Sequence, residues 1–285
     1  MRVLVTDESG VWKCTHSEAA PKQLPFELEC PCTPCAAHAL IACCCEKTHE
    51  CLCLQRHSWN PVSCMPAVPG ISSMVFSPCE RYLYQLGTEA DSIHTRLTAT
   101  GELLFAAPVG VFPRSMRMIQ QGRRLLIAGG AAGEAYILRA PELLNERTIY
   151  TRHACFSADL WAGGIVLVCA AEGDDIHTVI YTLSARGVKP AKLTELPGQP
   201  GGLCVCPDGK TALVSTPDGL MKLDLCSGIV LWNRPEWALC MHLECRGSRV
   251  LISDTLDGRI CLMNHNAPWE QQILFRGTTA QACFL

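Results

Sequence analysis

The stretch Gly202–Trp232, GLCVCPDGKTALVSTPDGLMKLDLCSGIVLW, holds four short apolar runs separated by three turn signals. Two of these turns are marked by Asp208-Gly209 and Asp218-Gly219, since Asp-Gly is favoured where a tight hairpin turn needs positive φ angles. Ser227-Gly228 marks the third turn. Four short strands joined by three hairpins predict one antiparallel, four-stranded sheet.

An apolar triplet like Ala212-Leu213-Val214 recurs along the whole chain. The middle residues of the seven triplets are Leu4, Leu40, Leu83, Leu126, Leu167, Leu213 and Leu251. They follow one another at roughly 40 residues, the period of a propeller blade. A similar interval leads from Leu251 across the two termini to Leu4, so the repeat closes on itself.

The repeat therefore predicts an all-β fold, a seven-bladed β-propeller with four-stranded antiparallel blades. We expect the ring to be closed by pairing of the N- and C-terminal strands, Val3-Leu4-Val5 with Cys283-Phe284-Leu285, because closure removes exposed sheet edges. A single propeller domain would span residues 1–285. Its approximate repeat units are 1–37, 38–80, 81–123, 124–164, 165–210, 211–248 and 249–285.

One repeat carries a recognisable pattern. Cys206–Val214, CPDGKTALV, with Asp218-Gly219 and Leu223-Asp224 after it, resembles the YVTN-type repeat, and Phe76–Tyr84, FSPCERYLY, is a second copy. The Gly-His and Trp-Asp dipeptides of true WD repeats are missing, so the chain is only WD-repeat-like. The resemblance implies the propeller architecture alone, because its motif residues specify turns and strands and carry no chemistry.

Composition narrows the classes of partner and location. The chain has 24 basic and 27 acidic residues, which give a net charge of −3 and no basic footprint for nucleic acid. No apolar run approaches the length of a membrane span, and the N-terminus lacks a signal-peptide core. We expect a cytoplasmic monomer. Its 20 cysteines are then reduced thiols that act mainly as small buried hydrophobes.

The links between blades are the best place for a ligand site, because they lie around the mouth of the central channel. Polar residues expected there are Arg114, Arg117, His153, Asp159, Glu236 and His242. The arginines are suited to holding a carboxylate or phosphate, and a histidine beside them could do acid–base work. The alternative is that these side chains are solvated loop residues or pack at the interfaces between blades.

Cysteines are densest at Cys30, Cys32 and Cys35, with Cys43-Cys44-Cys45 and Cys51-x-Cys53 following. Zinc and iron–sulfur sites use such spacings in pairs. On a strand, however, Cys43 and Cys45 point to one side and Cys44 to the other, so one face offers only part of a tetrahedral ligand set. We therefore expect buried thiols, with no metal and no cofactor.

Two functions from different classes remain open. The first is a non-catalytic binding or scaffold propeller that recognises a protein or a small-molecule ligand at the channel mouth. The second is a hydrolase that resembles the propeller lactonases, which act on sugar lactones and share this architecture. No local motif of this sequence matches their catalytic residues, and fold alone does not imply function.

Overall fold

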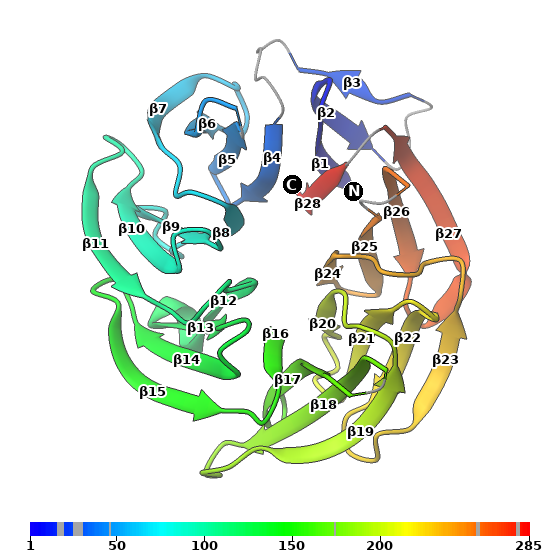
Figure 1. Cartoon of the computed structure of the whole chain (residues 1–285). Coiled ribbons are helices and arrows are strands. Elements are labelled where there is room, and N and C mark those ends of the chain that lie inside the picture. The colour runs from blue at the N-terminus through cyan, green and yellow to red at the C-terminus, as the bar shows by residue number, and fades with distance from the viewer. Residues whose placement is uncertain (16–19, 25–30, 46, 174, 255–256, 278–279) are drawn as a thin grey trace.

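The computed structural model of the chain is a ring of seven four-stranded antiparallel blades (Figure 1). The structure describes residues 1–15, 20–24, 31–45, 47–173, 175–254, 257–277 and 280–285, and for residues 31 and 32 it describes the backbone alone. Within these residues the one helical element is a short 3₁₀ turn, η1 (Gln120–Gly122). Among them there is also no helical segment with the length and hydropathy of a membrane span.

Each blade has its first strand innermost and its fourth strand at the rim. Blade 1 combines β28 (Gln281–Phe284), β1 (Arg2–Asp7), β2 (Gly10–Thr15) and β3 (Lys22–Gln23); blade 2 has β4 (Pro31–Ala36), β5 (Leu40–Cys45), β6 (Glu50–Gln55) and β7 (Pro61–Pro66). Blade 3 has β8 (Ile71–Phe76), β9 (Tyr82–Gly87), β10 (Ser92–Leu97) and β11 (Leu103–Pro108); blade 4 has β12 (Ser115–Ile119), β13 (Arg124–Ala128), β14 (Glu134–Arg139) and β15 (Leu144–Tyr150). Blade 5 has β16 (Ala154–Trp161), β17 (Gly164–Ala171), β18 (His177–Ser184) and β19 (Ala191–Pro197). Blade 6 has β20 (Leu203–Val205), β21 (Thr211–Thr216), β22 (Gly219–Asp224) and β23 (Val230–Arg234); blade 7 has β24 (His242–Arg246), β25 (Arg249–Asp254), β26 (Arg259–Asn264) and β27 (Ala267–Arg276).

The two ends of the chain close the ring, as the sequence predicts. Strand β28 pairs antiparallel with β1, with Leu4 opposite Cys283 and Val3 opposite Phe284. The backbone N–H of Leu285 also donates to the carbonyl of Arg2 at 3.0 Å. Figure 1 shows both termini beside these strands near the centre of the ring. Closure leaves no innermost strand without a neighbour in its blade.

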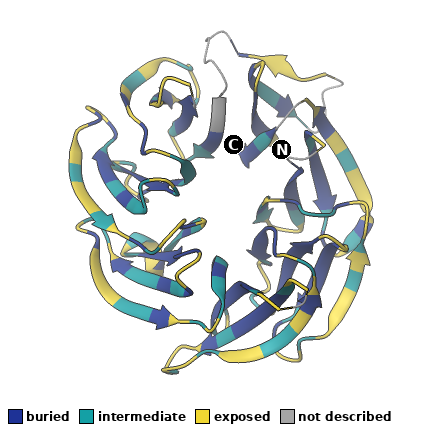
Figure 2. Ribbon diagram, in the orientation of Figure 1, coloured by how far each residue is buried: buried dark blue, intermediate teal, exposed yellow. Residues whose placement is uncertain are grey.

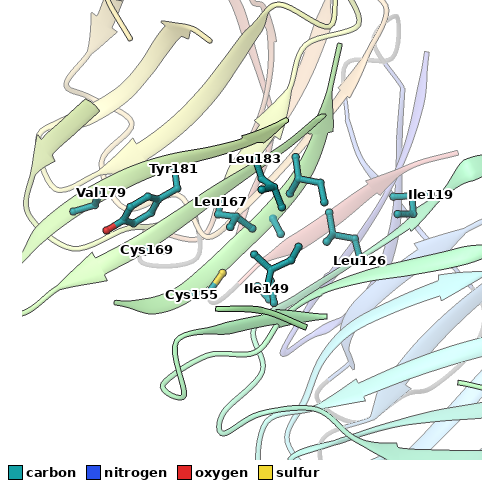
Figure 3. Close-up of a cluster of buried hydrophobic side chains, with 13 residues drawn as sticks. Ile119, Leu126, Ile149, Cys155, Leu167, Cys169, Val179, Tyr181 and Leu183 are labelled. Atoms are coloured by element: carbon teal, nitrogen blue, oxygen red, sulfur yellow. The ribbon is translucent and has the colours of Figure 1, made fainter. Parts of the chain in front are cut away.

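Apolar side chains fill the spaces between blades. Second strands are the most buried, and β21 is buried along its whole length, whereas fourth strands such as β11 are largely exposed (Figure 2). Between blades 4 and 5, Leu126 and Leu167 are 0 % exposed and pack with Cys155 and Leu183 (Figure 3). Burying one such leucine stabilises the fold by about 2 kcal/mol.

The rim strands share one irregularity. In blades 2 to 7 the pairing of the third with the fourth strand shifts register, once in blades 2 to 6, for example between Ile180 and Tyr181 in blade 5, and twice in blade 7. Such bulges bend the strand and increase its twist, which protects an exposed edge from pairing with other chains. The recurrence supports a repeated structural unit.

Candidate functional site

The first strands and the links before them surround a cavity of about 430 Å³ at one end of the central channel. Two arginines, Arg114 and Arg117, line it together with His242 and the ring of Phe156. Hydroxyl groups of Ser72, Ser73, Ser115 and Ser157 complete much of its polar wall. No Asp or Glu belongs to the lining, as far as the structure describes the chain. The cavity is therefore a cationic, hydroxyl-rich pocket.

Arg117 crosses the channel. It lies on β12 of blade 4, and its Nη2 donates to the carbonyl oxygens of Leu243 at 3.2 Å and Leu203 at 3.4 Å, on blades 7 and 6. Burial alone lowers the pKa of this guanidinium, but the carboxylates of Asp159 and Glu244 more than offset it, and the pKa is raised. The side chain is thus a fixed cation held from three sides of the ring.

His242 begins β24 and lies beside Arg117. Its Nε2 is buried and has no hydrogen-bond partner in the described part of the protein. Burial, followed by the positive charge of Arg117, lowers the pKa of His242 to about 4. The imidazole is therefore neutral at pH 7, and a buried ring nitrogen remains available to a ligand or a water molecule.

Arg114 lies in the link before β12, at the open side of the cavity. Its guanidinium carbon sits 5.4 Å from the centre of the Phe156 ring, a cation–π contact between blades 4 and 5. The side chain is exposed, and it forms no ion pair with any described residue. This leaves a positively charged group at the cavity mouth without a carboxylate to neutralise it.

Asp159 has a different role from its neighbours. Its Oδ2 accepts from the backbone N–H of Val205 at 3.0 Å, and its Oδ1 accepts from the N–H of Leu160 at 2.8 Å. The carboxylate therefore ties blade 5 to blade 6 and supplies negative charge to Arg117 without lining the cavity. Its position suits it to stabilise the charge of the arginine and not to contact a ligand.

Two other predicted residues lie away from this cavity. His153 precedes β16, and its ring centre is 6.3 Å from that of Tyr181 in the body of blade 5. Glu236 follows β23 and pairs with Arg234 beside it, which lowers the pKa of the carboxyl. Neither lines the cavity that brings Arg114, Arg117 and His242 together.

Sequence reasoning missed several residues of the site. Ser72, Ser115 and Ser157 recur at the blade period on the first strands, and a comparison of repeat positions would have found them. Phe156 lies directly before Ser157 in the sequence, so the same comparison of repeat positions would have drawn attention to it. Glu244 was also missed: its Oε2 accepts from the N–H of Phe284 at 3.0 Å, and burial raises its pKa.

A second cavity, of about 410 Å³, lies along the same channel. Arg117 and His242 line both cavities, so this pair stands between them. The second cavity is bordered by two carboxylates, Glu80 and Glu244, and by four sulfur-bearing residues, Cys35, Met74, Met118 and Cys283. The channel is thus divided into a cationic half and a half with sulfur side chains and two carboxylates.

The predicted cysteine cluster is only partly described. Cys30 and the side chain of Cys32 lie outside the described residues, and burial raises the pKa of Cys35 well above its usual value. No group of three or more His, Cys, Asp or Glu side chains within the described ranges is arranged to hold a metal ion. No donor set for a conventional zinc or iron site follows from these residues.

The many acidic turns between second and third strands serve local structure. Asp7 Oδ1 accepts from Ser9 and from the indole Nε1 of Trp12 at 3.0 Å, and Asp91 Oδ1 accepts from the N–H of Phe112 at 2.7 Å. Asp254 forms an ion pair with Arg259. The Asp7 contacts favour turn formation as a reason for such carboxylates, whereas Asp91 ties its turn to the link between blades 3 and 4.

Comparison with known proteins supports the fold and no family. No protein-family model matches the chain, and no curated protein sequence matches it. The structure shows the propeller fold, whereas assignment of the repeats to the YVTN type stays a prediction.

Among solved structures, hydrazine synthase of Kuenenia stuttgartiensis superimposes with a TM-score of 0.69 at 11% identity, over 88% of this chain and 80% of that one. A "putative 6-phosphogluconolactonase" of Bacteroides uniformis gives 0.60 at 15% identity, over 79% and 77% of the two chains. Its counterpart from Bacteroides fragilis gives 0.61 at 15% identity, over 80% and 78%. At these identities the likeness is to the propeller fold alone.

Proposed function

We propose that this propeller is a binding module whose channel mouth holds a small anion, a carboxylate or a phosphate ester. The observation that carries the proposal is the pair Arg114 and Arg117 in one cavity whose described lining has no carboxylate. Arginine matches the planar geometry of carboxylate and phosphate oxygens with two parallel N–H donors. A negatively charged ligand would complete the charge balance of this pocket.

Arg117 is prepared for such a ligand. Its Nη2 is committed to two backbone carbonyls, whereas Nε and Nη1 have no acceptor in the described part of the protein. The guanidinium is therefore oriented before binding, so little side-chain entropy is lost when the ligand arrives. Arg114 at the mouth would supply the second charge, and its contact with Phe156 limits where it can move.

The rest of the cavity suits a polar metabolite. Its volume of about 430 Å³ is within the range of small-molecule sites. The serine hydroxyls can donate or accept, and the Nε2 of His242 adds a partner for one more polar group. We place this binding in the cytoplasm, where buried thiols such as those of Cys44 and Cys51 stay reduced.

Isothermal titration with inorganic phosphate and with citrate tests the proposal and separates the two anion classes. We expect one site, and we expect Arg114→Gln to weaken it about tenfold, the effect of losing one charged hydrogen bond. Arg276→Gln on the rim strand β27 is the matched control, since it removes an exposed arginine far from the channel. Equal weakening by both variants would show general charge attraction and refute the site.

A second candidate, hydrolysis of sugar lactones, has one specific observation in its favour. The neutral imidazole of His242 has an unpartnered nitrogen directly beside the fixed cation Arg117. Such a pair could activate water and stabilise a developing oxyanion. The two Bacteroides propellers named above support this candidate only through their shared fold.

Turnover of glucono-δ-lactone, and of its 6-phosphate, separates the two candidates. The enzyme proposal predicts hydrolysis above the buffer rate that His242→Gln abolishes while anion binding persists. No turnover above buffer, together with retained phosphate or citrate binding, leaves the binding module as the function.

A further inference from the structure

Three sulfur atoms meet in the buried space between blades 2 and 3. Cys44 on β5 and Cys51 on β6 face each other directly across the two strands. The Sδ of Met74, on β8 of the next blade, lies 3.4 Å from the Sγ of Cys44 and 3.6 Å from that of Cys51. Both cysteines are 0 % exposed and Met74 is 7 % exposed.

Simple packing would not require this chemistry. The equivalent space between blades 4 and 5 is filled mainly by Leu, Ile and Val. Between blades 2 and 3 the cluster also includes Cys53 and Met65, with Cys35 packed against it. Thiols can donate weak hydrogen bonds to a thioether, which accounts for the contacts in the absence of a ligand. The concentration of soft donors in one interface calls for a further explanation.

We propose that Cys44, Cys51 and Met74 form a binding site for a soft monovalent cation, Cu(I). Thiolates and thioethers together select this ion over Zn²⁺ or Mg²⁺, which take nitrogen, thiolate or oxygen ligands. A trigonal centre with metal–sulfur bonds of about 2.3 Å sets its sulfurs about 4.0 Å apart. The separations of the Met74 sulfur from the two thiols would need to widen by about 0.6 and 0.4 Å to accept the ion.

The charge balance of the surroundings supports this assignment. Binding displaces one proton from each thiol, so two thiolates and Cu(I) carry a net charge of −1. Arg96 on β10 is 8 % exposed and donates only to neutral groups, the Oε1 of Gln85 and the carbonyl of Gly101. It has no carboxylate partner among the described residues; burial lowers the pKa of Arg96, and negative charge at Cys51 would act in the opposite direction. A bis-thiolate centre would give this buried cation its counter-ion.

An entry route also exists. Met74 and Cys35 line the channel cavity of about 410 Å³, while Met74 contacts the two buried cysteines. An ion that reaches the channel could therefore pass from Cys35 and Met74 to the inner thiols by exchange of sulfur ligands. This site is separate from the cationic cavity, so its test does not depend on the anion-binding proposal.

The experiment is an anaerobic titration of the reduced protein with Cu(I), in competition with a chromogenic Cu(I) chelator, followed by X-ray absorption at the copper edge. We expect one equivalent of Cu(I) to bind more tightly than copper bound by the remaining cysteines, and we expect only sulfur atoms in its first coordination shell. Met74→Leu preserves the shape of the core and should weaken this equivalent more than about tenfold. Met65→Leu is the matched control, because Met65 is buried in the same cluster opposite Cys51, yet no sulfur–sulfur contact joins it to a thiol of the described residues.

The outcomes are distinct. Loss of the tight equivalent in Met74→Leu, with an unchanged Met65→Leu variant and native circular dichroism in both, supports the site. Equal affinity in wild type and Met74→Leu overturns it, and so does copper spread over many weak thiols with no tight equivalent. Nitrogen or oxygen in the first shell would also refute the three-sulfur assignment.

Discussion

The channel wall and the blade interfaces are built from the same innermost strands, yet they hold opposite chemistry. On β12, Arg117 reaches into the channel and bonds to carbonyls across it, whereas Met116 is buried against blade 3. The interfaces contain aliphatic and sulfur side chains, and the channel contains Arg117, His242 and Glu244. We therefore expect the stability of the fold to depend mainly on the side chains buried between blades. The polar side chains of the channel wall contribute less to stability and can bind a ligand.

The interface between blades 4 and 5 should show the largest loss of stability. Leu167→Ala removes a side chain that is 0 % exposed and leaves a cavity, which should lower the free energy of unfolding by about 2–5 kcal/mol. Urea unfolding measures this change. Affinity for phosphate should stay as in wild type at temperatures where the variant is folded. A loss below about 0.5 kcal/mol would mean that the interface is not the main source of stability.

On the channel wall, His242 should make stability depend on pH. The pKa of about 4 in the fold lies below the value of about 6.5 expected when unfolded, so the unfolded state binds more protons between these values. The contribution is fully present above pH 6.5 and is lost as the pH falls toward 4.

The unfolding free energy of wild type should therefore fall on going from pH 7 to pH 4, and the fall should be about 2–3 kcal/mol smaller in His242→Gln. This figure allows for partial exposure of the ring. Urea unfolding at the two pH values measures the difference. Identical pH dependence of the two proteins would contradict a neutral imidazole of lowered pKa at this position.

The sulfur-rich interface should tolerate truncation better than the aliphatic one. Cys44→Ala removes a single sulfur atom, so we expect a loss of about 1 kcal/mol in unfolding free energy for the metal-free protein. Thermal unfolding under reducing conditions gives the comparison with Leu167→Ala. A loss as large as that of Leu167→Ala would show that the thiols serve packing above all.

Arg114 should have the smallest effect on stability. It is exposed and has no ion-pair partner among the described residues, so Arg114→Gln should change the unfolding free energy by less than about 0.5 kcal/mol. Thermal unfolding without added anion measures it. A larger loss of unfolding free energy would show that Arg114 contributes to the stability of the fold and is not reserved for a ligand.

Much of the fold could be predicted because its signals are local. Turn residues such as Asp208-Gly209, with apolar triplets at the blade period, indicate strands and hairpins without any long-range information. Pairing of the N- and C-terminal strands followed from the same period carried across the termini. Alternation along β5 also placed Cys43 and Cys44 on opposite faces, and they pack in different clusters.

The site was harder to predict because it depends on contacts across the ring. Arg117 and Leu243 are brought together only by closure of the whole propeller, which no local pattern encodes. His153 and Glu236 lie in links, where no strand period determines the direction of a side chain, and they bind Tyr181 and Arg234 locally instead. Met74 and Cys44 lie on different blades, so the sequence alone could not predict the contact between their sulfur atoms.

The most direct test of the central claim is a crystal structure of the protein grown with inorganic phosphate. We predict one phosphate in the cavity of about 430 Å³, with its oxygens on the guanidinium groups of Arg114 and Arg117. An empty cavity with phosphate bound only at rim arginines such as Arg276 would contradict it.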